Sequence, residues 1–279
     1  MTDPVTESQN ETQTEAQDEP VRYDVVDGVA TITLNRPDAM NSLDVATKVA
    51  LRDAVTEAAE DEAVRCVVLT GTGRAFCVGQ DLQEHVALLA EGPSDALFQT
   101  VPEHYNPTVK ALAQMPKPVV AAVNGIAAGA GASLAFACDL RVLADSAGFN
   151  LAFSGIALSC DTGSSWTLPR LVGHARALQL LYFPNTITAE ESLGLGLATR
   201  VVPADELATE VGALAQHLAS GPTVSYGAIR RSLGYSASHD LESSLAFEAE
   251  MMALTGATAD HRQAVEAFLA KQQPNFEGK

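Results

Sequence analysis

The sequence has few basic residues. Its 279 residues include 17 lysines and arginines against 35 aspartates and glutamates, which gives a net charge of −18 at pH 7. Lysine is especially scarce and occurs only at Lys48, Lys110, Lys117, Lys271 and Lys279. Such a surface repels the phosphates of nucleic acids and the headgroups of anionic membranes. The charge therefore argues against nucleic acid and the membrane surface as partners.

Cysteine is rare too. The four cysteines (Cys66, Cys77, Cys138 and Cys160) lie far apart, and no two of them form a Cys-x-x-Cys pair. Free buried thiols in a reducing cytoplasm are the favoured interpretation, and disulfides or a metal site are the alternatives. The sequence also lacks a clustered Cys/His set and a Walker-type loop, so we expect no metal and no redox cofactor.

Long apolar runs are missing as well, although 47% of the residues are hydrophobic and could fill a sizeable core. No run is long enough to cross a membrane, and the N-terminus is acidic rather than signal-like. These features predict a cytoplasmic protein. Residues 1–20 contain six acidic residues and no basic one, which predicts a disordered tail, with a functional acidic tail as the alternative.

The local patterns predict alternating strands and helices. Two β-rich runs, residues 23–26 and 29–34, flank Asp27-Gly28 and predict a hairpin. Ser42 is the expected N-cap of a helix that ends near Glu60. Further strands are expected at residues 64–69, 118–123, 140–144 and 199–202, with a capping box at Thr188-Ala189-Glu190-Glu191 before a helix. Alternating strands and helices favour a largely parallel sheet with right-handed crossovers.

The C-terminal quarter reads differently, because no further strand is expected in it. Helices are predicted at about residues 204–219, 222–234, 238–254 and 258–272.

Two glycine-rich turns stand out. In residues 118–139 a short β-branched run leads into the small, Gly-rich segment 124–131 and then into an apolar helix. Residues 71–82 have the same shape after the run 64–69. The free N–H groups at such turns suit a negatively charged oxygen. Two of them could therefore aim two donors at one carbonyl oxygen and form an oxyanion hole.

These turns carry a resemblance to a known family. The pairing of Arg74-Ala75-Phe76-Cys77-Val78-Gly79-Gln80-Asp81-Leu82 with Val123-Asn124-Gly125 and Gly129-Ala130-Gly131 resembles the crotonase superfamily, the enoyl-CoA hydratases and isomerases. The likeness runs from about Tyr23 to Phe276. It implies an α/β fold, a crotonase-type spiral of ββα units over residues 21–203. It also implies a helical trimerisation region over 204–279, and hence a homotrimer or a dimer of trimers.

The resemblance also implies where an acyl-CoA thioester binds. The backbone N–H groups of Gln80 and Ala130 would hold the carbonyl oxygen, and their side chains would matter little because the backbone donates. The loop Asn35–Leu43 would lie against the adenine end of coenzyme A. The implied substrate contacts are Arg36, Ala39, Met40, Ala75, Phe76, Val78, Gly79, Gly129, Gly131 and Ser133. The alternatives are a plain strand-to-helix loop and glycines that only allow close packing.

The expected carboxylates depart from the hydratase pattern. A typical hydratase of this family holds water between two glutamates, but the matching positions here are Ser133 and the segment Ala152-Phe153-Ser154. Serine is a poor base near neutral pH. Residues Asp161-Thr162-Gly163-Ser164-Ser165-Trp166-Thr167-Leu168-Pro169-Arg170 are similar to the 1,2-epoxyphenylacetyl-CoA isomerase branch, in which that Asp is the acid/base. Asp161 is thus the expected proton shuttle, and a plain N-cap is the alternative. Asp139 is expected to be structural.

Residues 85–107 predict a mobile helical lid with breaks at Gly92-Pro93 and Pro102. By resemblance, this lid borders the acyl pocket and sets substrate choice. His85, His104 and Tyr105 lie in it and either contact the substrate or serve as surface and packing residues.

One carboxylate fits isomerisation of an enoyl-CoA better than hydration. The alternatives are an enoyl-CoA hydratase with an altered acid/base arrangement and a non-catalytic acyl-CoA binder. Coenzyme A would enter only as part of the substrate. The pathway could be phenylacetate breakdown or β-oxidation.

The acidic surface generates a first prediction, because it resembles that of proteins from cells with molar internal salt. Salt shortens the screening length from about 10 Å at 0.1 M to about 3 Å at 1 M, which weakens repulsion among carboxylates. We therefore expect the melting temperature, followed by circular dichroism, to rise from dilute buffer to molar KCl. Full stability without added salt would contradict this adaptation.

Overall fold

The strands lie in two sheets. The computed structural model describes residues 19–90 and 96–279. The larger sheet has the order β1-β2-β3-β5-β7-β10 and the smaller one β4-β6-β8-β9. The strands are β1 Val21–Val26, β2 Val29–Leu34, β3 Cys66–Gly71, β4 Ala75–Cys77, β5 Val119–Val123, β6 Ile126–Ala128, β7 Leu140–Ala144, β8 Gly148–Asn150, β9 Ile187–Thr188 and β10 Arg200–Val202.

Helices cover these sheets and form the C-terminal part. They are α2 Val45–Glu60, α3 Leu82–Ala90, α4 Ala96–Thr100, α5 Asn106–Gln114, α6 Ala130–Ala137, α7 Ser164–Val172, α8 His174–Tyr182, α9 Ala189–Gly194, α10 Leu207–Ala219, α11 Thr223–Ser236, α12 Leu241–Gly256 and α13 Ala259–Ala270. Two 3-10 turns, Pro37–Ala39 and Ser154–Ile156, and a π-helix, Val101–Tyr105, complete the described part.

The chain winds as a spiral of ββα units. The units β3-β4-α3, β5-β6-α6 and β7-β8-α7 each add one strand to each sheet, side by side with the previous unit. Pairing is parallel throughout except for the hairpin β1-β2 and the pair β8-β9. The predicted hairpin, largely parallel sheet and spiral are therefore confirmed.

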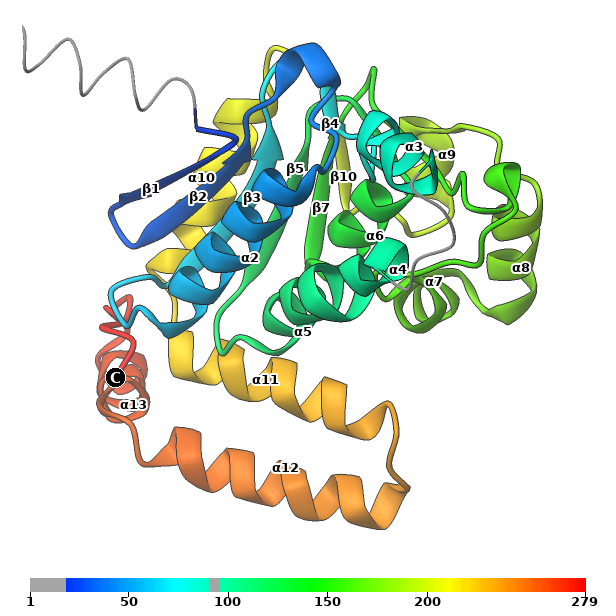
Figure 1. Cartoon of the computed structure of the whole chain (residues 1–279). Coiled ribbons are helices and arrows are strands. Elements are labelled where there is room, and N and C mark those ends of the chain that lie inside the picture. Colours follow the sequence, from blue (N-terminus) through cyan, green and yellow to red (C-terminus); the bar gives the residue numbers. More distant parts are fainter. Residues whose placement is uncertain (1–18, 91–95) are drawn as a thin grey trace, which may run out of the picture.

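Helices pack on both sides of the larger sheet (Figure 1). α10 packs against β2, β3, β5 and β7, while α2 packs against β1, β2 and α5. Apolar side chains fill the layers between them, because burying them away from water is the main stabilising term of the fold. Fully buried examples are Ile32, Leu34, Leu69, Leu112, Leu134, Leu143 and Phe149.

The last three helices extend away from the sheets. α11 and α12 lie side by side as a pair, with α13 beyond them (Figure 1). Arg230 of α11 ties this region to the core, since its guanidinium bonds Asp139 at 2.8 Å and the carbonyls of Leu112 and Lys117 at 2.7 Å each. The contact with Arg230 supports the structural role expected for Asp139.

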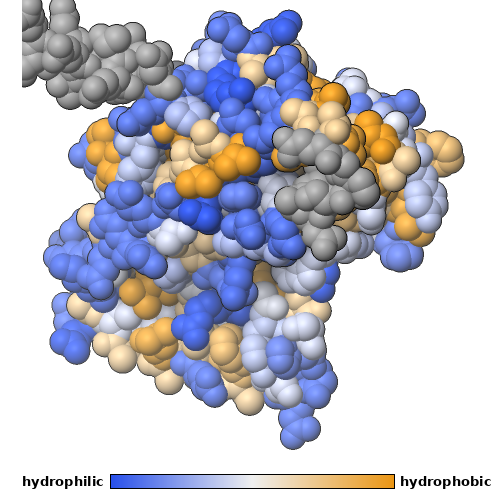
Figure 2. Space-filling view, viewed as in Figure 1, coloured by the Kyte–Doolittle hydropathy of each residue, from blue (hydrophilic) through white to orange (hydrophobic). Residues whose placement is uncertain are grey.

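This helical region exposes apolar side chains, and Figure 2 shows hydrophobic surface among hydrophilic residues on the same part of the molecule. The exposed apolar residues of α11, α12 and α13 are Ile229, Leu233, Leu241, Leu245, Met252, Leu254, Val265, Phe268 and Leu269. In the described ranges, no helix has the length and apolar character needed to cross a membrane.

Several sequence expectations need correction or lie outside the description. The helix expected to be capped by Ser42 begins at Val45, and Asp44 caps it by accepting from the N–H of Thr47 at 2.8 Å. Ser42 instead donates its hydroxyl to Asp81. Pro102 does not break the lid, because it sits in the first turn of the π-helix, where no N–H donor is needed. Of the predicted tail 1–20, residues 1–18 lie outside the described residues, as does the break at Gly92-Pro93, whereas the carbonyls of Glu19 and Pro20 accept hydrogen bonds from Asn35.

Four short strands, which make up the whole smaller sheet, were not foreseen, and two of them lie inside the predicted glycine turns. These two are β4 and β6, and they pair in parallel. The four cysteines are free thiols, and all but Cys160 are buried, as expected. Burial raises the pKa of the Cys77 thiol in β4 to about 12, so the group behind the turn is not a thiolate at neutral pH.

The packing at Gly131 generates the second prediction. A Cβ at this position would lie 2.1 Å from the carbonyl oxygen of Cys77, closer than atoms can approach. Gly131→Ala must therefore push α6 away from β4. We expect it to lower the free energy of unfolding by about 1–3 kcal/mol in urea titrations. The control Gly212→Ala adds a Cβ in open space on α10 and should be neutral or stabilising. Equal effects of the two changes would contradict this packing.

Candidate active site

Two asparagine amides hold the first glycine turn. Asn41 and Asn124 both donate from Nδ2 to the carbonyl of Ala75, at 2.8 and 3.1 Å, and Asn124 accepts from the N–H of Gly71 at 3.3 Å. Hydrogen bonds between side-chain amides and backbone groups hold a turn in place where hydrogen bonds of a helix or strand are lacking. Neither asparagine was predicted to have a role of its own, although Asn41 lies in the loop 35–43 and Asn124 in the second glycine turn.

The two turns meet at Gly79 and Ala130. Gly79 has φ +84°, which favours glycine, and a Cβ there would lie 2.9 Å from the carbonyl oxygen of Ala128 and 3.2 Å from the nitrogen of Ala130. The structure thus places Gly79, which precedes the expected donor Gln80, beside Ala130, which is the other expected donor.

Two backbone hydrogen bonds to Leu43 hold the chain on both sides of Gln80. Leu43 donates its N–H to the carbonyl of Gly79 at 2.8 Å and accepts from the N–H of Asp81 at 3.1 Å. Among the described residues, the N–H of Gln80 itself donates to no acceptor. This N–H therefore remains available to a ligand.

Ala130 supplies the second free donor. It is the first residue of α6, so its N–H has no partner one turn earlier in the helix. Gly129, the N-cap, has φ +51° and ψ −122° and contributes no side-chain cap. Its own N–H is donated to the carbonyl of Asn150 in β8 at 2.9 Å, which fixes the turn. An oxygen at this helix end would meet free N–H groups and the positive end of the helix dipole.

Asp161 lies just before α7. Its carboxylate accepts from the Thr162 hydroxyl at 2.8 Å, and the residue is half-buried. The plain N-cap interpretation is wrong, because α7 begins at Ser164 with Gly163 as its N-cap and without a side-chain cap. Burial raises the pKa of the Asp161 carboxyl, against the opposing effect of the Thr162 hydroxyl. A raised pKa suits a group that takes and returns protons.

Ser133 connects α6, which begins at Ala130, to α7, which follows Asp161. It is fully buried, and its hydroxyl lies 2.5 Å from that of Ser164 and donates to the carbonyl of Gly129 at 3.0 Å. The pair therefore fixes α7 against the start of α6. Its contact with substrate stays a prediction.

The loop with Arg36, Ala39 and Met40 runs beside the first turn. The N–H of Val78 is donated to the carbonyl of Met40 at 3.3 Å. The Arg36 guanidinium pairs with Asp44 at 3.1 Å and with Asp81 at 3.0 Å. These contacts place three predicted substrate residues next to the candidate oxyanion hole.

The same loop fixes the carboxyl of Asp81, the residue before α3. Burial alone would raise the pKa of Asp81, but bonds from Arg36, Ser42 and the N–H groups of Gln83 and Glu84 outweigh it and lower that pKa. Asp81 is thus a fixed anion that orders the turn rather than a proton carrier.

Other predicted contacts are more deeply placed. Ala75 and Phe76 are 1% and 0% exposed, backbone included, and their contacts with a substrate stay predictions. In the lid, His85 and His104 are half-buried, and His104 lies 3.2 Å from the Thr100 hydroxyl. Tyr105 is buried and donates its hydroxyl to Oε1 of Gln80 at 2.7 Å.

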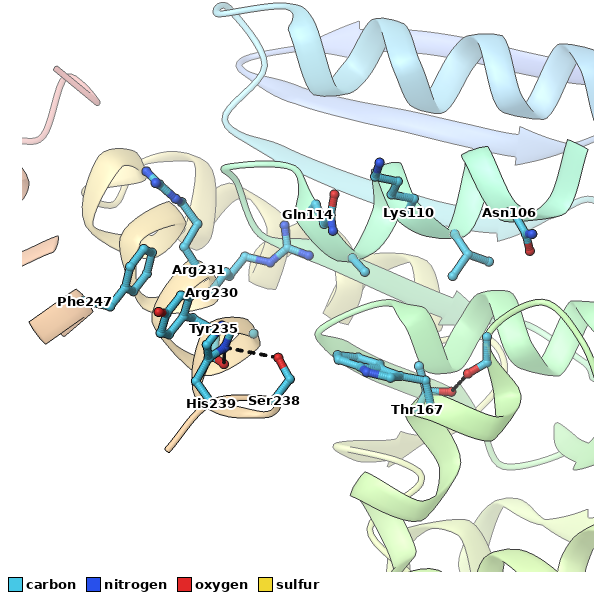
Figure 3. Close-up of a pocket in the computed structure, with 15 residues that line it drawn as sticks. Asn106, Lys110, Gln114, Thr167, Arg230, Arg231, Tyr235, Ser238, His239 and Phe247 are labelled. Atoms are coloured by element: carbon cyan, nitrogen blue, oxygen red, sulfur yellow. Dashed lines mark hydrogen bonds between the residues drawn. The ribbon is translucent and has the colours of Figure 1, made fainter. Parts of the chain in front are cut away.

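A cavity of about 800 Å³ lies between α5, α7, α11 and α12 (Figure 3). The ring of Tyr235 stacks between His239 and Phe247 on one side of it, at centroid distances of 3.6 and 4.3 Å. Gly163, two residues after Asp161, lines it, whereas the oxyanion residues do not. The cavity thus adjoins the turn of the acid.

Two adjoining turns with free N–H groups, a half-buried carboxylate and this spiral point to one class of protein, and comparison with known proteins agrees. The family model for enoyl-CoA hydratase/isomerase matches residues 24–279. The chain belongs to this family, the crotonase family expected from the sequence.

Individual relatives carry both activity names. The chain is 42% identical over 252 residues to a 1,2-epoxyphenylacetyl-CoA isomerase of Escherichia coli, covering 90% of this chain and 96% of that protein. It is also 42% identical to a probable enoyl-CoA hydratase of Rhodobacter capsulatus, over 93% and 98% of the two chains. A crystal structure of a putative enoyl-CoA hydratase/isomerase from Mycobacterium abscessus superposes with a TM-score of 0.89, 42% identity and coverage of 93% and 100%.

The raised pKa of Asp161 generates the third prediction. Folding takes up a proton when a folded-state pKa is raised, so wild-type stability falls as pH rises from the ordinary Asp pKa through the raised value. Asp161→Asn removes this penalty while keeping an acceptor for Thr162. We expect the variant to melt at or above the wild-type temperature at pH 7, with the gap shrinking toward pH 4.5 in calorimetry. Asp145→Asn, at an exposed site, is the control. A gap of the opposite sign would contradict the raised pKa.

Proposed function

We propose that the protein is an acyl-CoA isomerase that shifts a double bond, or makes a related rearrangement, next to a CoA thioester. The observation that carries this proposal is the combination of two adjoining turns, each with a free N–H group, and the half-buried carboxylate of Asp161. Between residues 123 and 170 the only other acids are Asp139, which is paired with Arg230, and the exposed Asp145.

In the proposed reaction, the carboxylate of Asp161 removes a proton from C2 of a 3-enoyl-CoA. The electron pair of the broken C–H bond forms the C1–C2 double bond of a dienolate, and negative charge moves to the thioester oxygen. The N–H groups of Gln80 and Ala130 stabilise that charge. The same carboxyl group then returns the proton to C4, and the double bond comes to lie between C2 and C3.

Hydration is the second candidate, because a relative as similar as the isomerase is named a probable hydratase. Addition of water needs a group that holds and activates the water molecule. The Ser133 hydroxyl is buried and already bonded to Ser164 and Gly129, which argues against that use. A non-catalytic acyl-CoA binder would keep the two donors and lose turnover.

We also propose that the Arg36 loop receives the nucleotide end of coenzyme A. Its support is the position of Met40 beside Val78 and the two carboxylates that fix Arg36. The exposed apolar side chains of α11 to α13 support a homotrimer or a dimer of trimers, in which second copies would cover them. No metal or redox group is part of this proposal.

Turnover by Asp161→Asn provides the fourth prediction. We expect wild type to convert 3-enoyl-CoA to 2-enoyl-CoA and the variant to lose about 10²- to 10⁴-fold in kcat, because general acid–base catalysis contributes about that factor. Binding of a saturated acyl-CoA, measured by calorimetry, should be unchanged, and Asp145→Asn should retain full activity. The rates are measured in high salt on matched 3-enoyl-CoA and 2-enoyl-CoA.

Three outcomes would argue against this proposal. If wild type only hydrates 2-enoyl-CoA, the hydratase alternative stands. If both substrates bind without turnover, an epoxyphenylacetyl-CoA assay separates a ring-specific isomerase from a binder. If Asp161→Asn keeps wild-type isomerase activity, another group carries the proton.

A further inference from the structure

A polar cluster lies behind the first oxyanion donor. It consists of Lys48, Gln80, Glu84 and Tyr105, which come from α2, the first turn, α3 and the π-helix. Lys48 is 2% exposed and Tyr105 is 4% exposed. Burying a lysine is costly unless its charge is paired and its donors are used. The buried ammonium group of Lys48 therefore needs a charge partner and hydrogen-bond acceptors, which Glu84 and Gln80 provide.

Three contacts in this cluster converge on the side chain of Gln80. Its Oε1 accepts from the Tyr105 hydroxyl at 2.7 Å and from Lys48 Nζ at 3.2 Å. Its Nε2 donates to Oε1 of Glu84 at 3.0 Å, and Glu84 closes the ring with an ion pair to Lys48 at 2.9 Å. Because the amide both accepts and donates, its orientation is fixed.

Tyr105 is the member that links the site to the lid. Burial, and then the negative charge of Asp161, raise the pKa of Tyr105 well above its usual value, so its hydroxyl stays protonated and donates. Tyr105 ends a π-helix, a form that often occurs at functional sites.

We propose that Tyr105 is a positioning residue, which holds the Gln80 side chain and through it aims the Gln80 N–H at the thioester oxygen. The backbone bonds of Leu43 fix the peptides on either side of Gln80, and the amide cluster fixes the remaining rotation. The oxyanion hole thereby depends on the side chain of Gln80, although Gln80 donates to the thioester through its backbone N–H. This inference rests on the proposed oxyanion role of Gln80.

Tyr105→Phe tests the inference, because it removes one oxygen and leaves the buried ring. A misplacement of about 1 Å in an active site can cost about 10²-fold in rate, so loss of one positioning bond should lower kcat about tenfold. KM should change little, because coenzyme A contacts remain. Tyr182→Phe is the matched control, since Tyr182 is 65% exposed and should show wild-type kcat.

Infrared spectroscopy of bound, carbonyl-labelled butyryl-CoA gives a readout that does not need turnover. Hydrogen bonds to the carbonyl lower its stretching frequency. We expect a lowered frequency in wild type and in Tyr182→Phe, and a frequency closer to that of the free ester in Tyr105→Phe. An unshifted carbonyl in wild type would overturn the oxyanion role itself. A shifted carbonyl in wild type and an identical one in Tyr105→Phe would overturn only the inference about Tyr105.

A double-mutant cycle separates positioning from general stability. Gln80→Met removes the amide and keeps the side-chain length. If Tyr105 acts through Gln80, adding Tyr105→Phe to Gln80→Met should lower kcat no further, because contacting residues are not additive. Independent, multiplying losses would overturn the inference. Melting temperatures of all variants show whether each is folded at the assay temperature.

Discussion

The parallel pairing of β4 with β6 is the contact on which the site depends. Each strand has only three residues, and each lies inside a glycine turn of the sequence. Their pairing places Gly79 beside Ala130 and packs Gly131 onto the carbonyl of Cys77, so two turns from distant parts of the chain, each with a free N–H group, lie next to each other. Only glycine allows this approach, because any side chain would meet backbone atoms.

Desolvation shapes the chemistry around this contact. The carboxyl of Asp161 has a raised pKa because it is half-buried and receives one hydroxyl bond, whereas Asp81, with several donors, has a lowered one. Of five lysines in the sequence, Lys48 is one that the fold buries. In so acidic a chain, this burial places a rare positive charge behind the oxyanion turn, where it is paired with Glu84.

Most of the fold followed from local patterns, because strand runs and Asp27-Gly28 specify their structures directly. The smaller sheet, β4, β6, β8 and β9, did not, since strands of two or three residues owe their existence to tertiary pairing. The cap at Asp44 was missed because the bridge between Leu43 and Gln80 delays the helix. The positions of Gln80, Ala130 and Asp161 could be predicted only through the resemblance. Lys48 shares a helical face with Leu51 and Val55, a signal that could have revealed the buried cluster.

A crystal structure with a bound saturated acyl-CoA would test the central claim most directly. The account predicts the thioester oxygen about 2.7–3.1 Å from the backbone nitrogens of both Gln80 and Ala130. It also predicts the carboxyl of Asp161 facing the acyl carbons rather than the solvent. A thioester oxygen that contacts neither nitrogen, or an acyl chain on the far side of α6 from Asp161, would contradict it.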